Sequence, residues 1–493
     1  MQDSCSSLLE HYNKLSSFEQ TLLQFQSIIY EPAHTALIVN CLRKLDIRSP
    51  RGNRPTAANL NHYFSKFQDL GLLSKEKQCV PQLVEQFSRM AVRDNSFDRY
   101  AKVIRKEAPV SYYYGKWTTR CWRAMREMRI GIYTQDFDLI DDALEFLSGQ
   151  CRDILSPLPP TVQVTTSPFD PVWFRNLPPS FQFFLLDKIF RYELASLNTH
   201  PEILSYLQEE TGLEELSSDE KLPFQRLLFI QYLFRGRMAE ARTLVEENSG
   251  SFNGTGALGT LAFLSGEKGS SEELFGKDLD FLRELSGSDN VAFFGPTGLF
   301  HILSNLELDQ SDQEQKVARQ IGVALSLFSK SVEEKSYQAL AEFLQVRSNS
   351  ALPGEEIVFH KDEELHSLTI LFTALCQYWL NSNLEPEVRK RVESLYTQAM
   401  DNGFHFFSLN LAAILAGIGQ NSEEYNSVVS RLQEETGCSP LINILESEEP
   451  WKRNLQALIQ ATASPQRGES SLSERLIWML DYKNGVMAIN PRE

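Results

Sequence analysis

Arginine and lysine side chains concentrate in the first 129 residues of the chain. This part holds 20 Lys and Arg against 12 Asp and Glu, a net charge of +8, whereas the remaining residues hold 28 against 53, a net charge of −25; together they give the −17 of the whole chain. Cationic side chains bind phosphate, and an acidic surface repels a polyanion. The sequence therefore predicts two units that face different partners, with nucleic acid as the candidate for the first.

No motif for catalysis is found anywhere in the sequence. The phosphate-binding pattern GxxxxGK[ST], the zinc-protease pattern HExxH and the nucleophile pattern GxSxG are all missing. His360 and His366 flank Glu363 and Glu364, but these residues fall at a predicted loop–helix junction and are not interpreted as a metal site. The chain is therefore expected to have no cofactor, no metal and no catalytic residue of its own, and it should not hydrolyse ATP.

The spacing of apolar residues predicts a winged helix-turn-helix domain over residues 1–95. A helix capped by Ser16 or Ser17 comes first, a second follows Pro32, and a third presents apolar residues at spacings of four and three before Gly71. The residues from 72 to 80 read as a short hairpin. Three helices followed by a two-stranded wing form a DNA-binding layout in which the third helix enters the major groove.

The predicted nucleic-acid-binding residues lie in the basic loop before the third helix, on its outward face, in the wing, and on a later helix. They are Arg48, Arg51, Arg54, Asn59, His62, Lys66, Lys75, Lys77, Arg120 and Arg123. The alternative interpretation is a protein-docking module whose cations form an ordinary solvated face, because a fold does not by itself determine a function.

Residues 96–150 are predicted to form a basic helical connector. Trp117, Cys121, Ala124 and Met128 fall on one apolar stripe, which predicts that they are core and that the arginines between them form a cationic outer face. Base stacking by the aromatic residues of this segment is the alternative. The proline-rich residues 151–180 are predicted to be a linker.

Residues 181–462 are predicted to form an irregular α-helical solenoid similar to tetratricopeptide arrays, so the whole chain is predicted to be mainly α. Helical periodicity on both sides of Gly236 predicts a helix pair with six inward-facing residues, and the Ser- and Gly-rich residues 249–271 are predicted to be a loop. The six are Leu227, Leu228, Leu233, Met238, Ala241 and Leu244. The acidic surface of the solenoid predicts a protein partner.

The cysteine pattern and the hydropathy of the sequence indicate the cellular compartment of the protein. Seven cysteines are scattered singly with no CxxC pair, which fits a reducing compartment and predicts free thiols. No apolar run approaches the ~18–20 residues of a membrane span. A cytoplasmic protein without a membrane partner is expected.

The last residues of the chain carry a family resemblance. Residues 474–481 (ERLIWMLD) and 485–493 (GVMAINPRE) predict two short strands around a turn, with 463–493 forming a linker and the start of a β region. This stretch resembles the segment that precedes the ATPase core in bacterial helicase-like proteins of the SWI/SNF type. The resemblance implies that the chain is the N-terminal part of a longer protein whose motor follows, and none of the family's functional residues has a counterpart here.

Three functions follow from these observations. The first is a non-catalytic N-terminal module of a SWI/SNF-type DNA translocase, which engages DNA through the winged helix and a protein partner or its own motor through the acidic solenoid. The second is a free-standing winged-helix transcriptional regulator with a tetratricopeptide-like sensor. The third is a pure protein-interaction scaffold.

Overall fold

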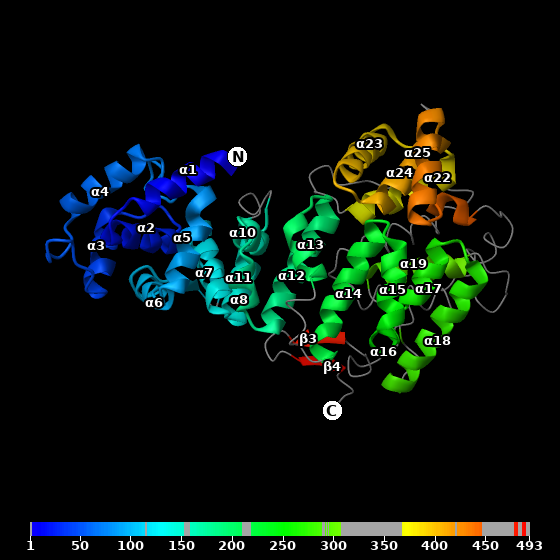
Figure 1. Ribbon diagram of the computed structural model, residues 1–493, viewed down its shortest axis with the longest axis horizontal. Coiled ribbons are helices and arrows are strands. Elements are labelled where there is room, and N and C mark those ends of the chain that lie inside the picture. Colours follow the sequence, from blue (N-terminus) through cyan, green and yellow to red (C-terminus); the bar gives the residue numbers. More distant parts are fainter. Residues whose placement is uncertain are drawn as a thin grey trace. The chain divides into compact units, whose positions relative to one another are not determined.

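The computed structural model describes residues 2–113, 116–151, 158–209, 218–287, 291, 293, 295–306, 367–419, 422–445, 478–481 and 486–489. The chain is mainly helical, as predicted (Figure 1). It divides into two compact units, and the boundary between Ile189 and Phe190 falls inside helix α12 (Pro179–Ser196). Each unit is described below by itself.

The first unit is a bundle of helices with one small hairpin. Its elements are α1 (Gln2–Asn13), α2 (Ser17–Ile29), α3 (Thr35–Lys44), α4 (Ala57–Asp69), α5 (Pro81–Arg93), α6 (Phe97–Glu107), β1 (Tyr112–Tyr113), β2 (Lys116–Trp117), α7 (Cys121–Thr134), α8 (Phe137–Gln150), α10 (Pro160–Thr166) and α11 (Pro171–Arg175). Helix α2 packs against α5 and α6, α3 packs against α4 and α6, and α7 forms a hairpin with α8.

The three helices predicted before Gly71 are α2, α3 and α4. Leu60, Phe64 and Phe67 are buried on the inner face of α4, as their spacing predicts. Gly71 follows α4 with φ = 71°, a left-handed conformation that glycine adopts at no steric cost. The predicted wing is reduced to a single antiparallel bridge between Leu73 and Cys79.

The proline-rich segment predicted to be a linker is, in its described part from residue 158 onward, a packed piece of the first unit. Helix α10 lies against α7 and buries Val162 and Val164, and α11 buries Trp173 and Phe174. Prolines at the first turns of α10 and α11 start these helices, because a proline there removes no intrahelical hydrogen bond. Proline content alone therefore gave the wrong interpretation of 158–180.

A disulfide joins Cys121, the first residue of α7, to Cys151, directly after α8. It closes the open end of the α7–α8 hairpin, whose other end turns at Gln135 in a left-handed conformation. The expectation that all cysteines are free thiols is wrong for this pair. Cys41, Cys79 and Cys438 are free and buried.

The second unit consists of helical hairpins. It begins in α12 and contains α13 (Pro201–Gln208), α14 (Ser218–Phe234), α15 (Met238–Glu247), α16 (Ser249–Phe252), α17 (Ala257–Leu264), α18 (Lys268–Ser286), α19 (Gly295–Leu306), α22 (Ser367–Asn381), α23 (Pro386–Asp401), α24 (His405–Gly417), α25 (Ser422–Thr436) and the 3-10 turn η2 (Leu441–Leu445). Consecutive helices pack on one another from α13 to α15 and from α22 to α25.

The later helices of the second unit also pack back on earlier ones. Helix α24 lies against α14, and the Arg235 guanidinium at the end of α14 donates to the Asn402 carbonyl between α23 and α24. Arg235 is held in turn by the buried Glu193 carboxylate at 3.2 Å. The contacts are therefore not limited to sequence neighbours, as they would be in a one-dimensional solenoid.

The helix pair around Gly236 forms as predicted, with a left-handed glycine between α14 and α15. Of the six residues predicted to face inward, three are buried and three are half-buried. Leu233, Met238 and Ala241 are buried, and Leu227, Leu228 and Leu244 are half-buried. The predicted loop over 249–271 is wrong, because this segment contains α16, α17 and the beginning of α18.

The predicted C-terminal hairpin is present as strands β3 (Trp478–Asp481) and β4 (Val486–Ile489), which pair antiparallel with Trp478 opposite Ile489 and Asp481 opposite Val486. The rest of the predicted linker and β region, 463–477, 482–485 and 490–493, lies outside the described residues, as do His360 and His366.

Candidate nucleic-acid interface

The outward face of α4 carries few free charges. Asn59 and His62 are exposed on it, as predicted. Lys66, the only cation of this helix, forms an ion pair at 2.6 Å with the Glu19 carboxylate of α2. The face is therefore polar and close to neutral. Its side chains could contact bases, but the face would attract phosphate only weakly.

Glu19 is fixed by the start of its own helix. The Ser16 hydroxyl accepts from the Glu19 amide, and the Glu19 carboxylate accepts from the Ser16 amide at 2.9 Å, which is a complete capping box. Burial would raise the pKa of Glu19, but the hydrogen bonds from Lys66 and Ser16 outweigh it and lower the pKa below its usual value. The Glu19 carboxylate is therefore ionised at neutral pH.

Free cations lie on both sides of α4. Arg51 and Arg54 in the preceding loop and Lys75 in the following turn are exposed, and no carboxylate of the described residues pairs with them. Arg48 is also exposed but pairs with Asp46 at 3.2 Å. Along the chain, these side chains come before and after the polar residues of α4, which is the order expected for a recognition helix with flanking phosphate contacts.

Lys77 is not a free wing cation. Its ammonium donates to the Thr35 hydroxyl at 2.7 Å and to the Asn61 side-chain oxygen at 3.2 Å, and it lies over the ring of Phe64. These contacts fasten the 74–78 turn to α3 and α4. Lys77 therefore has a structural role that the charge pattern alone does not show.

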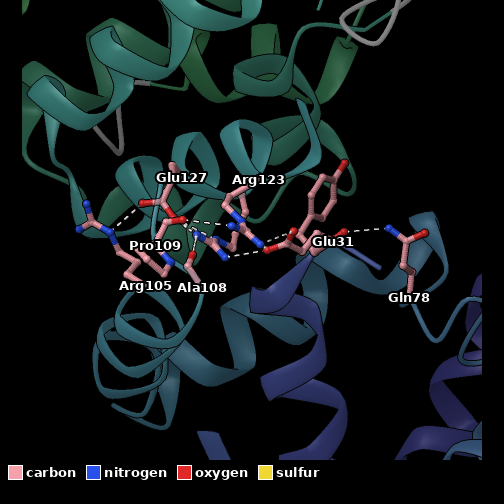
Figure 2. A network of polar contacts seen from close by, with 9 residues as sticks. Glu31, Gln78, Arg105, Ala108, Pro109, Arg123 and Glu127 are labelled. Atoms are coloured by element: carbon pink, nitrogen blue, oxygen red, sulfur yellow. Dashed lines mark hydrogen bonds and ion pairs between the residues drawn. The ribbon is translucent and has the colours of Figure 1, made fainter. Parts of the chain in front are cut away.

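The arginines of α7 do not form the predicted cationic outer face. Arg126 is completely buried, with its guanidinium paired to Glu31 at 2.9 Å and to Glu127, and Arg123 is paired to Glu31 at 2.9 Å. Arg105 of α6 pairs with Glu127 at 2.7 Å (Figure 2). These three arginines and two carboxylates are thus linked in one network of ion pairs.

Backbone carbonyls at the end of α6 complete this network. Arg126 donates to the Ala108 carbonyl at 2.7 Å, and Arg123 donates to the Pro109 carbonyl at 3.0 Å (Figure 2). The network therefore ties α7 to both α2 and α6. Of the two residues predicted on this segment, Arg123 is half-buried and paired with Glu31, and Arg120 is exposed.

The Glu31 carboxylate reaches α7 because of an unusual turn. Tyr30 ends α2 with φ = 58°, a left-handed conformation that a bulky residue rarely adopts. Its carbonyl accepts from the Gln78 side chain at 2.9 Å, and its ring lies 4.2 Å from the Arg129 guanidinium carbon. Contacts on both sides of Tyr30 hold the strained turn that directs Glu31 to the arginines.

A second buried pair joins α7 to α5. Arg129 pairs with Glu85, and the Tyr133 hydroxyl donates to the same carboxylate at 2.8 Å. Burial would lower the pKa of Arg129, but the Glu85 charge raises it; burial and Glu85 together raise the pKa of Tyr133 well above its usual value. Arg129 therefore stays charged and Tyr133 stays neutral across the physiological range.

Three exposed cations of α6 are missing from the predicted site. Arg99, Lys102 and Lys106 lie at spacings of three and four, opposite the buried Phe97 and Ile104. Helical periodicity of the charged residues over 97–107 is the signal that could have identified them.

Comparison of the chain with protein-family models, with curated proteins and with solved structures gave no match. Among the described residues, no group of His, Cys, Asp and Glu side chains has the arrangement of a metal site. None of the described helices combines the length and the apolar character that crossing a bilayer requires.

Proposed function

We propose that this chain is a non-catalytic N-terminal module of a SWI/SNF-type DNA translocase. In this proposal a winged helix formed by α2, α3, α4 and the 72–80 turn engages duplex DNA, and the acidic second unit binds a protein partner or the motor. The C-terminal residues that resemble the pre-motor segment of this family supply the family assignment, and their pairing as β3 and β4 is consistent with it.

The observation that carries the DNA-binding part is the position of the free cations. Arg51, Arg54 and Lys75 are exposed and unpaired within the described chain, and they flank the exposed polar side chains Asn59 and His62 of α4. Phosphate contacts position a protein on DNA, and side chains that reach base edges supply specificity. With α4 in the major groove, the flanking cations would contact the phosphates and Asn59 would face the bases.

The pairing inside the unit sets the expected character of binding. Because Lys66, Lys77 and Arg123 are held by other side chains, only a few cations remain for phosphate. Each phosphate contact changes the logarithm of the affinity by about 0.9 per decade of salt concentration. Three contacts would give a slope of about 3, which describes a weak, salt-sensitive interaction with modest sequence preference.

The test is fluorescence anisotropy of the full chain with a labelled DNA duplex at several salt concentrations. Arg51→Glu with Arg54→Glu should abolish binding without unfolding, because both side chains are exposed, and Lys390→Glu on the exposed face of α23 should leave it unchanged. Glu19→Gln should release Lys66 and strengthen binding with a slope larger by about 0.9. Absence of duplex binding at low salt, or equal loss in the Lys390 control, contradicts the proposal.

A protein-docking role for the first unit is the second candidate. The observation that favours it is the near-neutral face of α4, where the single lysine is paired with Glu19. In that case the duplex does not bind, and Glu19→Gln gives no gain. A free-standing regulator differs from a translocase module only in what the second unit binds. In a pull-down with an isolated SWI/SNF-type motor domain, binding by the second unit supports the translocase module.

A further inference from the structure

Helix α6 presents a line of exposed cations that form no ion pair among the described residues. Arg99, Lys102 and Lys106 are exposed at positions i, i+3 and i+7, a span of about 10 Å along the axis. None of them pairs with a carboxylate of the described chain, whereas their neighbour Arg105 pairs with Glu127. Like charges at this spacing destabilise a helix slightly.

The helix dipole does not explain this line either. Cations are favourable in the last turn of a helix and unfavourable in the first. Lys106 lies in the last turn, but Arg99 is the third residue of α6 and lies in the first. The helix dipole therefore favours Lys106 but not Arg99.

Exposed aromatic rings follow directly after the stripe. Tyr112 and Tyr113 of β1 are 63% and 66% exposed, and Trp122 near the start of α7 is 40% exposed. Only five residues separate Lys106 from Tyr112, so their Cα atoms lie at most about 22 Å apart. Arg120, between the hairpin and α7, is exposed as well.

Internal contacts hold these rings in place. Tyr112 packs edge-on against the buried Trp117 at 6.5 Å between centroids, and Trp122 lies 5.9 Å from Tyr30. The residue after Trp122 is Arg123, which the network of Figure 2 fixes to Glu31 and to the Pro109 carbonyl. The rings are thus presented to solvent on a rigid support, which reduces the entropy lost when a ligand stacks on them.

We propose that the stripe Arg99, Lys102 and Lys106, together with Tyr112, Tyr113 and Trp122, binds single-stranded nucleic acid. Cations that follow a phosphate backbone beside aromatic rings that stack on bases are the chemistry of single-strand recognition, with sites of about 4–16 nucleotides. An acidic peptide would satisfy the cations but would leave the rings exposed. The inference does not rest on the duplex proposal, because it uses neither α4 nor its flanking cations.

The test measures anisotropy of the full chain with a labelled oligothymidylate, which has little structure of its own. Lys102→Glu with Lys106→Glu should weaken binding and reduce the salt slope by about 1.4, since each contact to a single strand contributes about 0.7. Lys390→Glu, the same charge change on exposed α23, is the matched control and should leave both affinity and slope unchanged.

A second variant tests the rings separately. Tyr112→Ala with Tyr113→Ala should weaken oligothymidylate binding at least fivefold while the salt slope stays the same, because stacking carries no charge. Phe281→Ala, an aromatic residue 39% exposed on α18, is its control. Circular dichroism checks that each variant is folded.

The outcomes separate this inference from the proposed duplex function. Oligothymidylate binding that Lys102→Glu/Lys106→Glu and the tyrosine variant both weaken, and that Arg51→Glu/Arg54→Glu leaves intact, supports it. No oligothymidylate binding at low salt, or binding that either stripe or ring variant leaves unchanged, overturns it. If the wild-type chain binds oligothymidylate but not the duplex, only the duplex proposal is overturned.

Discussion

Replacing Glu31 by Gln should destabilise the first unit more than replacing Arg126 by Met, although Arg126 is the more deeply buried residue. The reason lies in the partners that remain. Without Arg126, Glu31 keeps Arg123 at 2.9 and 3.2 Å and Glu127 keeps Arg105 at 2.7 Å, so every charge still has an opposite charge. Without the Glu31 carboxylate, Arg123 has no carboxylate partner, and Arg105 and Arg126 share the single carboxylate of Glu127.

The expected magnitudes follow from burial. Removing one partner of a buried ion pair costs about 3–5 kcal/mol, because a buried charge is left uncompensated. The Glu31 side chain is 5% exposed and Arg126 is 0% exposed, so this range applies to Glu31→Gln. Arg126→Met keeps most of the side-chain volume and leaves chiefly the buried Ala108 carbonyl without its donor, a cost of about 1–3 kcal/mol.

Hydrogen exchange followed by mass spectrometry at increasing urea concentrations measures the free energy of unfolding of the first unit separately, using peptides from α2, α6 and α7. Glu76→Gln, an exposed carboxylate in the 74–78 turn, is the control and should change the free energy of unfolding by less than about 0.5 kcal/mol. A Glu31→Gln cost no larger than that of Arg126→Met would refute the reasoning, because it would show that the carboxylate is dispensable to its arginines.

Three other outcomes are expected. The folded-state pKa of Glu19 is lowered from its usual 4.5, so its ion pair with Lys66 contributes stability that is present above pH 4.5 and is lost as the pH falls through the lowered value. In urea titrations, the difference in stability between wild type and Glu19→Gln should therefore shrink with acidification. Gly236→Ala should cost ~1–3 kcal/mol in thermal denaturation, because Gly236 has φ = 71° and the added Cβ would lie 2.6 Å from a threonine methyl. Gly276 lies in open space on α18, so Gly276→Ala should instead stabilise the protein by ~0.5–1 kcal/mol. Cys121→Ser should cost ~3–4 kcal/mol, since its disulfide closes a 30-residue separation, and dithiothreitol should lower the melting temperature of wild type but not of the variant.

Local signals account for the parts of the fold that the sequence predicts well. Leu60, Phe64 and Phe67 follow the helical repeat on α4, and Gly71 and Gly236 mark turns that need a left-handed residue. The free cations Arg51 and Arg54 were also predictable, because exposure is the ordinary state of charged residues in a polar loop.

Long-range pairing accounts for what could not be predicted. Nothing near Arg126 in the sequence indicates that its partner Glu31 lies 95 residues away, so the arginines of α7 read as an outer face. Gly259 shows the same limit for packing. Glycine and serine over 249–271 suggest a loop, but Gly259 lies inside α17, where the lack of a side chain lets the helix pack on Phe275: an added Cβ would lie 2.6 Å from that ring.

The network around Glu31 also restricts how the sequence can change over evolutionary time. Loss of the Glu31 carboxylate leaves Arg123 without a carboxylate and Arg126 with Glu127 alone, so we expect substitutions at position 31 to be tolerated only when positions 123 and 126 change with it. Positions 105 and 127 are coupled in the same way. Distant relatives of this chain should therefore be recognisable by concerted exchange at these five positions, even where the surrounding residues have diverged beyond alignment.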